Sequence, residues 1–284
     1  MSCVTIRDVL GKAKDGGYAV GAFNILDYGS MRAVMESAEE LNAPVIIQTS
    51  VRTMDFWGFE PVAGWYRQLA EDSPVPAVLH LDHCKELEII RKCIDAGWTS
   101  VMIDASSKPF EKNMEMTRTT IEMAKPAGVS VEAELGEIGG VEDDISVADE
   151  DAHLADPDKA ATFCMELEVD VFAPAIGTAH GVYKGEPKLA FDRLEEIARR
   201  TGLPIALHGG TGLSDEVFRK CISLGCAKVN ISTMLKYSFI NGFMEHGGFH
   251  KDDRNPINYL KAQIEHMKEG IKKKMVLFGS EGKA

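Results

Sequence analysis

The chain has 284 residues, of which 45% are hydrophobic and 26% are charged, and its formal net charge is −13. This length permits one large α/β barrel or two ordinary domains, with ample material for a core. The acidic balance argues against a nucleic-acid partner and against attraction to anionic membranes. Because no apolar run is long enough for a membrane span or a signal peptide, and the six cysteines are scattered, we expect a cytoplasmic protein with reduced thiols.

Short apolar runs alternate with amphipathic segments along the whole chain. Eight of the runs are apolar or β-branched enough for strands that are buried on both faces. They are residues 18–25, 44–50, 75–83, 100–106, 130–136, 169–178, 203–210 and 226–233. The segments between them predict helices, among them 30–41, 85–96, 113–124, 191–200 and 214–224.

This alternation predicts an α/β protein with a (β/α)8 TIM-barrel fold. A doubly wound sheet with an extra lobe is the alternative, because periodicity does not reveal closure. We favour the barrel, as a single domain over residues 1–284, because no linker or composition shift divides the chain.

Two stretches depart from the even spacing. Residues 137–158 follow the fifth predicted strand and contain Gly139-Gly140 and a cluster of acids, so we expect a long, functional or mobile loop. Residues 241–258 follow the eighth strand and contain Gly247-Gly248. We expect a second loop there, before a C-terminal helical extension from Ile257 to about Phe278.

Three of the eight histidines, His83, His180 and His208, stand where predicted strands end. In a barrel such positions converge on one rim, and three imidazoles that leave a coordination position open are typical of catalytic zinc. A structural histidine is the simpler interpretation of any one of them, but the coincidence of three favours a metal. Asp82 adjoins His83, and a buried carboxylate beside an imidazole indicates a site.

Further carboxylates and glycine-rich loops lie at the same predicted rim. Asp104 and Glu134 could orient a zinc-bound imidazole or offer a secondary metal position. Glu142, in the 137–158 stretch, is a candidate proton carrier that arrives when the substrate closes the site. The glycines around His180 and His208 let backbone N–H groups approach an oxyanion, and phosphate sites in barrels often follow strands seven and eight.

Several motifs resemble those of the class II, zinc-dependent ketose-bisphosphate aldolases, most closely the tagatose-bisphosphate branch. They are His80-Leu81-Asp82-His83, Val131-Glu132-Ala133-Glu134-Leu135-Gly136, Gly177-Thr178-Ala179-His180-Gly181, His208-Gly209 and the ending Phe278-Gly279-Ser280-Glu281-Gly282-Lys283-Ala284. The resemblance covers essentially all 284 residues. It implies reversible aldol cleavage of a ketose 1,6-bisphosphate, of tagatose or fructose type, to dihydroxyacetone phosphate and an aldehyde such as glyceraldehyde 3-phosphate.

The resemblance also implies roles for individual residues. His83, His180 and His208 would bind one Zn²⁺ per subunit, which stabilises the enediolate, while Asp82 and Glu142 would exchange protons with the aldehyde-derived oxygen and the ketone-derived carbon. Asp104 and Glu134 match a secondary metal position. The implied substrate contacts are Asn24, Ser50, Gly181, Lys184, Gly209, Gly210, Thr211, Asn230, Ile231, Ser232 and Thr233. A monovalent cation (Na⁺ or K⁺) and a homodimer or homotetramer are further implications.

Departures from the family pattern leave the substrate open. Gly210-Thr211 stands where relatives often have Ala-Ser, Ser232 replaces an aspartate common in fructose-bisphosphate enzymes, and residues 52–59 are unlike the usual pattern. Another ketose phosphate or a deoxy-keto-sugar-acid phosphate is therefore an alternative substrate. Two other hypotheses are a Schiff-base aldolase that uses Lys228 and a non-catalytic barrel that binds sugar phosphates.

Overall fold

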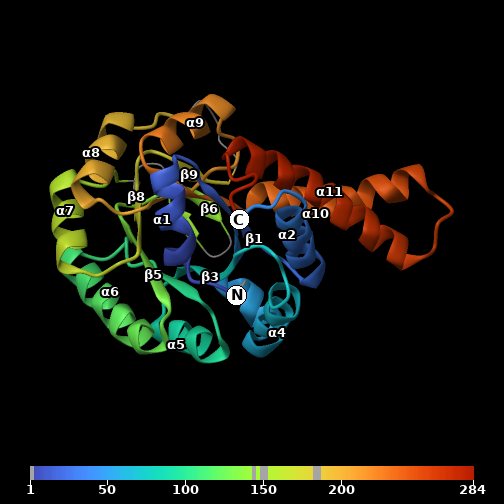
Figure 1. The fold of residues 1–284 in the computed structure, drawn as a ribbon, viewed down its shortest axis with the longest axis horizontal. Coiled ribbons are helices and arrows are strands. Elements are labelled where there is room, and N and C mark those ends of the chain that lie inside the picture. The colour runs from blue at the N-terminus through green and yellow to red at the C-terminus, as the bar shows by residue number, and fades with distance from the viewer. Residues whose placement is uncertain (1–2, 143–144, 148–152, 182–186) are drawn as a thin grey trace.

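Eight parallel strands form a closed barrel in the computed structural model, which describes residues 3–142, 145–147, 153–181 and 187–284 (Figure 1). Their order around the barrel is β1-β11-β10-β8-β5-β4-β3-β2. The strands are β1 (Val20–Asn24), β2 (Val45–Thr49), β3 (Ala77–Cys84), β4 (Ser100–Ile103), β5 (Ser130–Leu135), β8 (Val171–Pro174), β10 (Ile205–Leu207) and β11 (Cys226–Ile231). Each coincides with one of the eight predicted runs, so the TIM barrel is confirmed and the doubly wound alternative is wrong.

Helices surround the barrel as an outer layer (Figure 1). They are α2 (Tyr28–Glu40), α3 (Val51–Trp57), α4 (Phe59–Ala70), α5 (Leu87–Ala96), α6 (Phe110–Ala124) with the short 3-10 turn η1 (Lys125–Ala127), α7 (Pro157–Glu166), α8 (Phe191–Thr201) and α9 (Asp215–Ser223). The five helices predicted from periodicity are present, with ends within about one turn of those expected.

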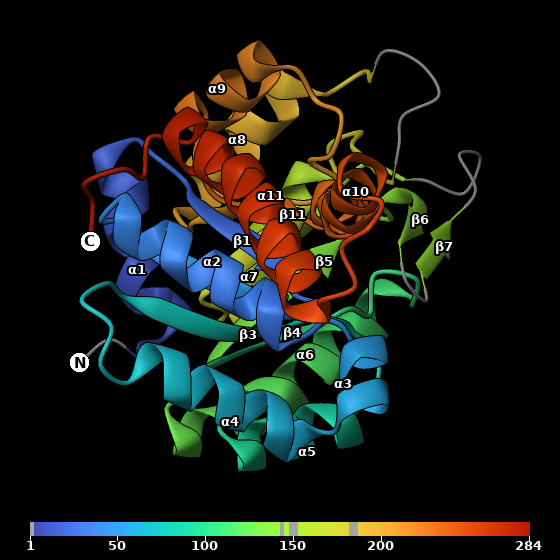
Figure 2. The ribbon, with the colours of Figure 1, turned by 90° about the vertical axis from the view of Figure 1, so that its right-hand side faces the viewer.

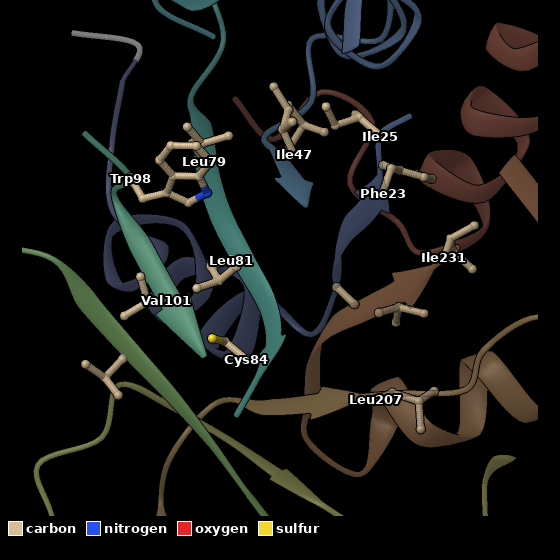
Figure 3. Close-up of a cluster of buried hydrophobic side chains, with 14 of the residues drawn as sticks. Phe23, Ile25, Ile47, Leu79, Leu81, Cys84, Trp98, Val101, Leu207 and Ile231 are labelled. Atoms are coloured by element: carbon tan, nitrogen blue, oxygen red, sulfur yellow. The ribbon is translucent and has the colours of Figure 1, made fainter. Parts of the chain in front are cut away.

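The outward-facing side chains of the strands make the larger core. Figure 3 shows Phe23, Leu79 and Leu81 among these side chains, together with Trp98 from the connection before β4, and all four are buried. Burial of a large apolar side chain of this kind contributes about 1.5–3 kcal/mol. The helix layer therefore provides much of the stability that holds the barrel closed.

A second apolar cluster fills the barrel interior near the N-terminal ends of the strands. Helix α1 (Ile6–Gly16) contributes Ile6, Val9 and Leu10 to it, and they pack with inward-facing residues such as Val20 and Val78. This helix therefore closes the N-terminal end of the strands. At the opposite end, where the strands terminate, polar side chains enter the interior. A ligand can bind at that end.

The described part of the stretch after β5 contains more regular secondary structure than we expected. Strand β6 (Gly139–Glu142) pairs antiparallel with β7 (Ile145–Val147) and parallel with β9 (Ala179–His180), and α7 begins at Pro157 behind its cap, Asp156. The expectation of an irregular loop is thus wrong for residues 139–142 and 145–147, which form strands, while the functional role expected of this stretch stays a prediction. The parallel pairing of β6 depends on β9, a segment far away in sequence.

The predicted loop at 241–258 is also wrong over most of its length. Helix α10 (Thr233–Phe249) continues through Gly247 and Gly248, and α11 (Pro256–Leu277) follows a short connection. A Cβ at Gly247 would lie 3.2 Å from the ring of Tyr259 on α11, so packing against that helix offsets the poor helix propensity of glycine.

Helix α11 is the predicted C-terminal helical extension, and the far end of the α10–α11 pair projects from the barrel (Figure 1). Figure 2 shows α11 lying alongside α2, where the Nζ of Lys268 is 2.9 Å from Glu36 Oε2. Among the described residues, we find no helix with the length and hydropathy needed to cross a membrane.

Candidate active site

An irregularity at the end of β3 brings the neighbouring residues Asp82 and His83 to the same side. Successive side chains of a strand point to opposite faces, so one of the pair would ordinarily face the helices. The register between β3 and β4 shifts between Leu81 and Cys84, and His83 has a φ of 46°. Such a left-handed backbone is uncommon for a residue other than glycine and is often found at functional sites. This backbone conformation lets the side chains of Asp82 and His83 both enter the barrel mouth.

The three histidines predicted from strand ends meet at this mouth. The Nδ1 of His208 lies 2.7 Å from the Nε2 of His83, and the His83 and His180 ring centroids are 4.8 Å apart. One ring nitrogen from each of the three histidines lies within 4.8 Å of the others. Three convergent imidazole nitrogens from separate strands fit the ligand set of a catalytic zinc ion.

Two carboxylates stand behind His83. Its Nδ1 lies 3.2 Å from Asp104 Oδ2 and 3.7 Å from Glu134 Oε2. Burial alone lowers the pKa of His83, but Asp82, Asp104 and Glu134 together raise it to about 10. Burial and the negative charge of Asp104 raise the pKa of Glu134. A cation beside these acids is therefore strongly favoured.

A buried charged layer lies directly beneath His208. Glu132 Oε1 is 2.8 Å from the Nε2 of His208, and Glu132 Oε2 is 2.9 Å from the Nζ of Lys228. His80 also faces Glu132, at 3.5 Å, and its other ring nitrogen lies 2.9 Å from Ser100 Oγ. Because Nε2 of His208 faces a carboxylate, its Nδ1 is the nitrogen that faces a metal.

Burial and the positive charge of its neighbours, His83 first, lower the pKa of His208 well below its usual value. This histidine is therefore neutral, which is the form that binds a metal. Glu132 and Glu134 are two residues apart on β5, so their side chains share one face of the strand, and both are buried inside the barrel. The sequence did not predict that Glu132 supports His208.

Side-chain amides hold the carboxylate of Asp82. Asn24 donates from Nδ2 to Asp82 Oδ2 at 2.9 Å, and Asn230 donates to Oδ1 at 3.2 Å. Gln48 donates in turn to Asn24 Oδ1 at 2.8 Å. Asp82 is outside both clusters of possible metal ligands found among the described residues. Its position is fixed beside the imidazoles, and the contribution of Gln48 was not predicted.

Two glycines fix the path of β9 and thus the position of His180. Gly140 pairs with His180 across β6 and β9, and a Cβ at Gly140 would collide with the His180 carbonyl oxygen. At Gly209 a Cβ would lie 2.5 Å from the carbonyl oxygen of Ala179. Both glycines have positive φ angles, of 97° and 66°. Glycine is required at both positions because the backbones approach so closely.

The remaining predicted substrate positions divide into three groups. Residues at the mouth and its loops are Asn24, Ser50, Gly181, Gly209, Gly210, Thr211, Asn230, Ser232 and Thr233. The side chain of Ile231 is buried in the core cluster shown in Figure 3, so only its backbone can face a ligand. Lys184 lies outside the described residues, and of Glu142 only the backbone, at the end of β6, is described.

Comparison with known proteins identifies the class to which this barrel belongs. The sequence profile described as "Fructose-bisphosphate aldolase class-II" matches residues 4–283. The chain is 42% identical over 287 residues to a fructose-bisphosphate aldolase of Staphylococcus epidermidis, with all of both chains covered. It is 37% identical over 284 residues to the sulfofructosephosphate aldolase of Alkalicoccus urumqiensis, covering 100% of this chain and 99% of that one.

A solved structure extends the same likeness to three dimensions. The crystal structure of the YdjI aldolase from Escherichia coli K12 matches with a TM-score of 0.89 and 33% identity, over 99% of each chain. The chain therefore belongs to the class II fructose-bisphosphate aldolase family. The resemblance stated from the sequence is confirmed at the level of the family, which makes the protein an aldolase, a carbon–carbon lyase.

Proposed function

We propose that this protein is a zinc-dependent aldolase that cleaves a ketose 1,6-bisphosphate, of fructose or tagatose type, to dihydroxyacetone phosphate and an aldehyde. The observation that carries the proposal is the arrangement at the barrel mouth. One ring nitrogen each of His83, His180 and His208 converges on a single point, and the carboxylate of Asp82 is held beside them. Bound at these three nitrogens, Zn²⁺ supplies Lewis-acid polarisation of the substrate carbonyl. Asp104 and Glu134 lie where they would offer a secondary metal position.

Asp82 is the group we assign to proton exchange with the aldehyde-derived oxygen. Its hydrogen bonds come from the side-chain amides of Asn24 and Asn230, which are neutral donors and hold the carboxylate in place. A proton carrier held in place contributes about 10²–10⁴-fold to the rate. The amides also keep Asp82 away from the imidazole cluster, so that it stays available to the substrate.

Backbone groups after the last two barrel strands are suited to hold a phosphate. Gly209 and Gly210 follow β10, and Ser232 and Thr233 lead into α10. The Ser232 Oγ is buried and has no hydrogen-bond partner among the described residues, so it is available to a ligand. We assign this region to the dihydroxyacetone phosphate half, and we assign Glu142, on β6, to the proton on the ketone-derived carbon.

Lys228 is poorly suited to the rival Schiff-base chemistry. Its ammonium group is fully buried and lies 2.9 Å from Glu132, inside the barrel and below the histidines. A Schiff-base lysine must present a neutral amine to the substrate. The contact with Glu132 holds the Nζ of Lys228 below the histidines instead, which supports the metal-dependent mechanism.

Replacement of Asp82 tests the proposal. In Asp82→Ala we expect kcat to fall by about 10²–10⁴-fold while the zinc content stays at one ion per chain. Asp95→Ala, at an exposed position on α5, is the matched control and should keep full activity. Wild-type rates in Asp82→Ala would contradict the proton-transfer role, whereas loss of zinc would indicate that Asp82 is a ligand.

A further inference from the structure

Two of the six cysteines, Cys221 and Cys226, lie together at the corner where helix α9 ends and strand β11 begins. Cys221 is in the last turn of α9, and Cys226 is the first residue of β11. Helix α9 belongs to the outer layer, close to α8 (Figure 1). Because parallel barrel strands begin at one end of the barrel and finish at the other, this pair lies at the end opposite to the histidines, and the proposed aldol chemistry does not use it.

The connection between the two cysteines follows one tight path. The N–H of Leu224 donates to the carbonyl oxygen of Cys221 at 3.1 Å, and Gly225 turns the chain with a φ of 111°. A Cβ at Gly225 would lie 2.9 Å from the Cβ of Ala198 on α8, so the turn also packs closely against that helix. Glycine adopts this φ without strain. The backbone therefore fixes the end of α9 relative to the start of β11, and with them the two cysteines.

The two thiols form a hydrogen bond with one another inside the apolar core. Cys221 is fully buried, and Cys226 is 2% exposed. The hydrogen bond lowers the pKa of the Cys221 thiol against the effect of burial, whereas the same contact and burial raise the pKa of Cys226 well above its usual value. Cys226 is therefore the donor and keeps its proton. Cys221 accepts, and it is the better nucleophile because thiols react as thiolates.

Three other thiols lie in the core or against it, at Cys84, Cys93 and Cys164. Burial raises the pKa of Cys84 to about 11 and that of Cys164 to about 12, and it also raises the pKa of Cys93. The thiol of Cys84 donates to the carbonyl oxygen of Glu86 at 3.3 Å. Thiols that are kept protonated in apolar surroundings react slowly. The lowered pKa of Cys221 distinguishes it from these three.

We propose that Cys221 and Cys226 are an oxidative modification site, a dithiol that hydrogen peroxide converts to an internal disulfide and that external thiols regenerate. The sulfurs are already in hydrogen-bond contact, so they need only close to about 2.05 Å, which small side-chain rotations provide. The neighbouring residues Lys220 and Ser223 are exposed, so the pair lies just beneath the surface. Its burial excludes bulky oxidants, whereas a molecule as small as hydrogen peroxide enters when the helix end opens locally.

The reaction has two steps. The Cys221 sulfur attacks one oxygen of hydrogen peroxide, the O–O bond breaks, and Cys221 becomes a sulfenic acid while the second oxygen leaves as water with the thiol proton. The Cys226 sulfur then attacks the Cys221 sulfur, the S–O bond breaks, and the hydroxyl group leaves as water with the Cys226 proton. The two thiols lose two electrons and two protons, and the peroxide is reduced to water. An external thiol reverses the change by thiol–disulfide exchange.

The test treats the zinc-loaded protein with a few equivalents of hydrogen peroxide, alkylates the remaining thiols after unfolding and maps them by mass spectrometry. Trypsin releases residues 221–228 as one peptide that holds both cysteines. We expect this peptide to lose two hydrogen atoms and to escape alkylation, at least about tenfold faster than Cys84 and Cys93 are oxidised. Dithiothreitol should restore both thiols.

Single replacements separate the roles of the two cysteines. In Cys226→Ala, Cys221 should stop at the sulfenic acid, which dimedone captures when the protein is unfolded in its presence. In Cys221→Ala, Cys226 should remain a thiol under the same treatment. Cys93→Ala, which removes another fully buried thiol, is the matched control and should leave disulfide formation unchanged.

The proposal stands apart from the aldolase function, and the wild-type mapping alone can refute it. A 221–228 peptide that stays fully alkylated while other thiols are oxidised would overturn it, and so would a disulfide between either cysteine and a third one. Sulfenic acid on Cys226 in Cys221→Ala, formed as fast as on Cys221 in Cys226→Ala, would overturn the assigned roles.

Discussion

The Nδ1 of His208 lies 2.7 Å from the Nε2 of His83, and the opposite nitrogen of each ring faces a carboxylate. Asp104 stands behind His83 and Glu132 behind His208. The carboxylates fix which nitrogen of each ring faces its neighbour. These two carboxylates inside the barrel therefore hold the His83 and His208 rings in the orientations that metal binding requires.

Glu132 is expected to control the affinity of the site for zinc. Glu132→Gln weakens the support of His208, so zinc should bind about 10- to 100-fold more weakly in competition with a chromophoric chelator. The change also leaves the ammonium group of Lys228 buried without its partner, so the free energy of unfolding should fall by about 3–5 kcal/mol. An unchanged zinc affinity would contradict the role of Glu132.

Two companion variants separate these effects. Adding Lys228→Met to Glu132→Gln removes the unpaired charge and should restore most of the stability, but not the zinc affinity. Glu122→Gln, at an exposed position on α6, should change neither quantity.

Asn24 is expected to position Asp82. Asn24→Ala removes the 2.9 Å hydrogen bond to Asp82 Oδ2 and the link to Gln48. A displaced proton carrier costs about 10²-fold in rate, so kcat should fall while the zinc content is unchanged. Asn241→Ala, at an exposed position on α10, is the control. A rise in KM alone, with kcat retained, would show that Asn24 only binds substrate.

Gly140 is expected to be essential for the position of His180. Gly140→Ala forces a Cβ against the His180 carbonyl oxygen at a φ of 97°, which costs about 1–3 kcal/mol and displaces β9. Calorimetry should show a lower Tm, and zinc should bind more weakly. Gly64→Ala on α4, where a Cβ meets nothing within 4 Å, should instead stabilise the protein by about 0.5–1 kcal/mol. Equal behaviour of the two variants would refute the close-approach argument.

The attachment of α11 to α2 is expected to weaken in acid. Burial alone raises the pKa of Glu36, but its hydrogen bonds with Lys268 and Arg32 lower it overall. A lowered folded-state pKa contributes stability above the unfolded pKa, near 4.5, and this contribution is lost as the pH falls through the folded pKa.

Glu36→Gln should therefore cost about 1 kcal/mol at pH 7 and progressively less below about pH 4.5. Urea unfolding of the zinc-free protein at several pH values measures this difference. A cost that stays constant between pH 7 and pH 3 would show that Glu36 acts by packing and not by charge.

Much of the fold and the centre of the site followed from the sequence. All eight barrel strands were predicted because strands buried on both faces are apolar runs, and this pattern is local. The convergence of His83, His180 and His208 followed from their strand ends, since parallel strands end on one rim. Asp104 and Glu134 were found by the same reasoning.

The other features of the fold and the site depend on contacts between segments that are far apart in the sequence, and a local sequence pattern does not predict such contacts. Strand β9 is only two residues long, and it becomes a strand through its pairing with β6, about 40 residues earlier in the sequence. Glu132 and Lys228 are 96 residues apart, so their ion pair requires the barrel to be closed. The continuation of α10 through Gly247 depends on packing against Tyr259 of α11.

The most direct test of the account is the dependence of ketose bisphosphate cleavage on zinc. The enzyme is treated with chelator, assayed with fructose and tagatose 1,6-bisphosphates, and assayed again after zinc is restored, with borohydride added in a parallel sample. We predict no cleavage without zinc, full recovery at one zinc ion per chain, and no inactivation by borohydride in the presence of substrate. Cleavage that persists without metal, or borohydride trapping of substrate on Lys228, would contradict the account.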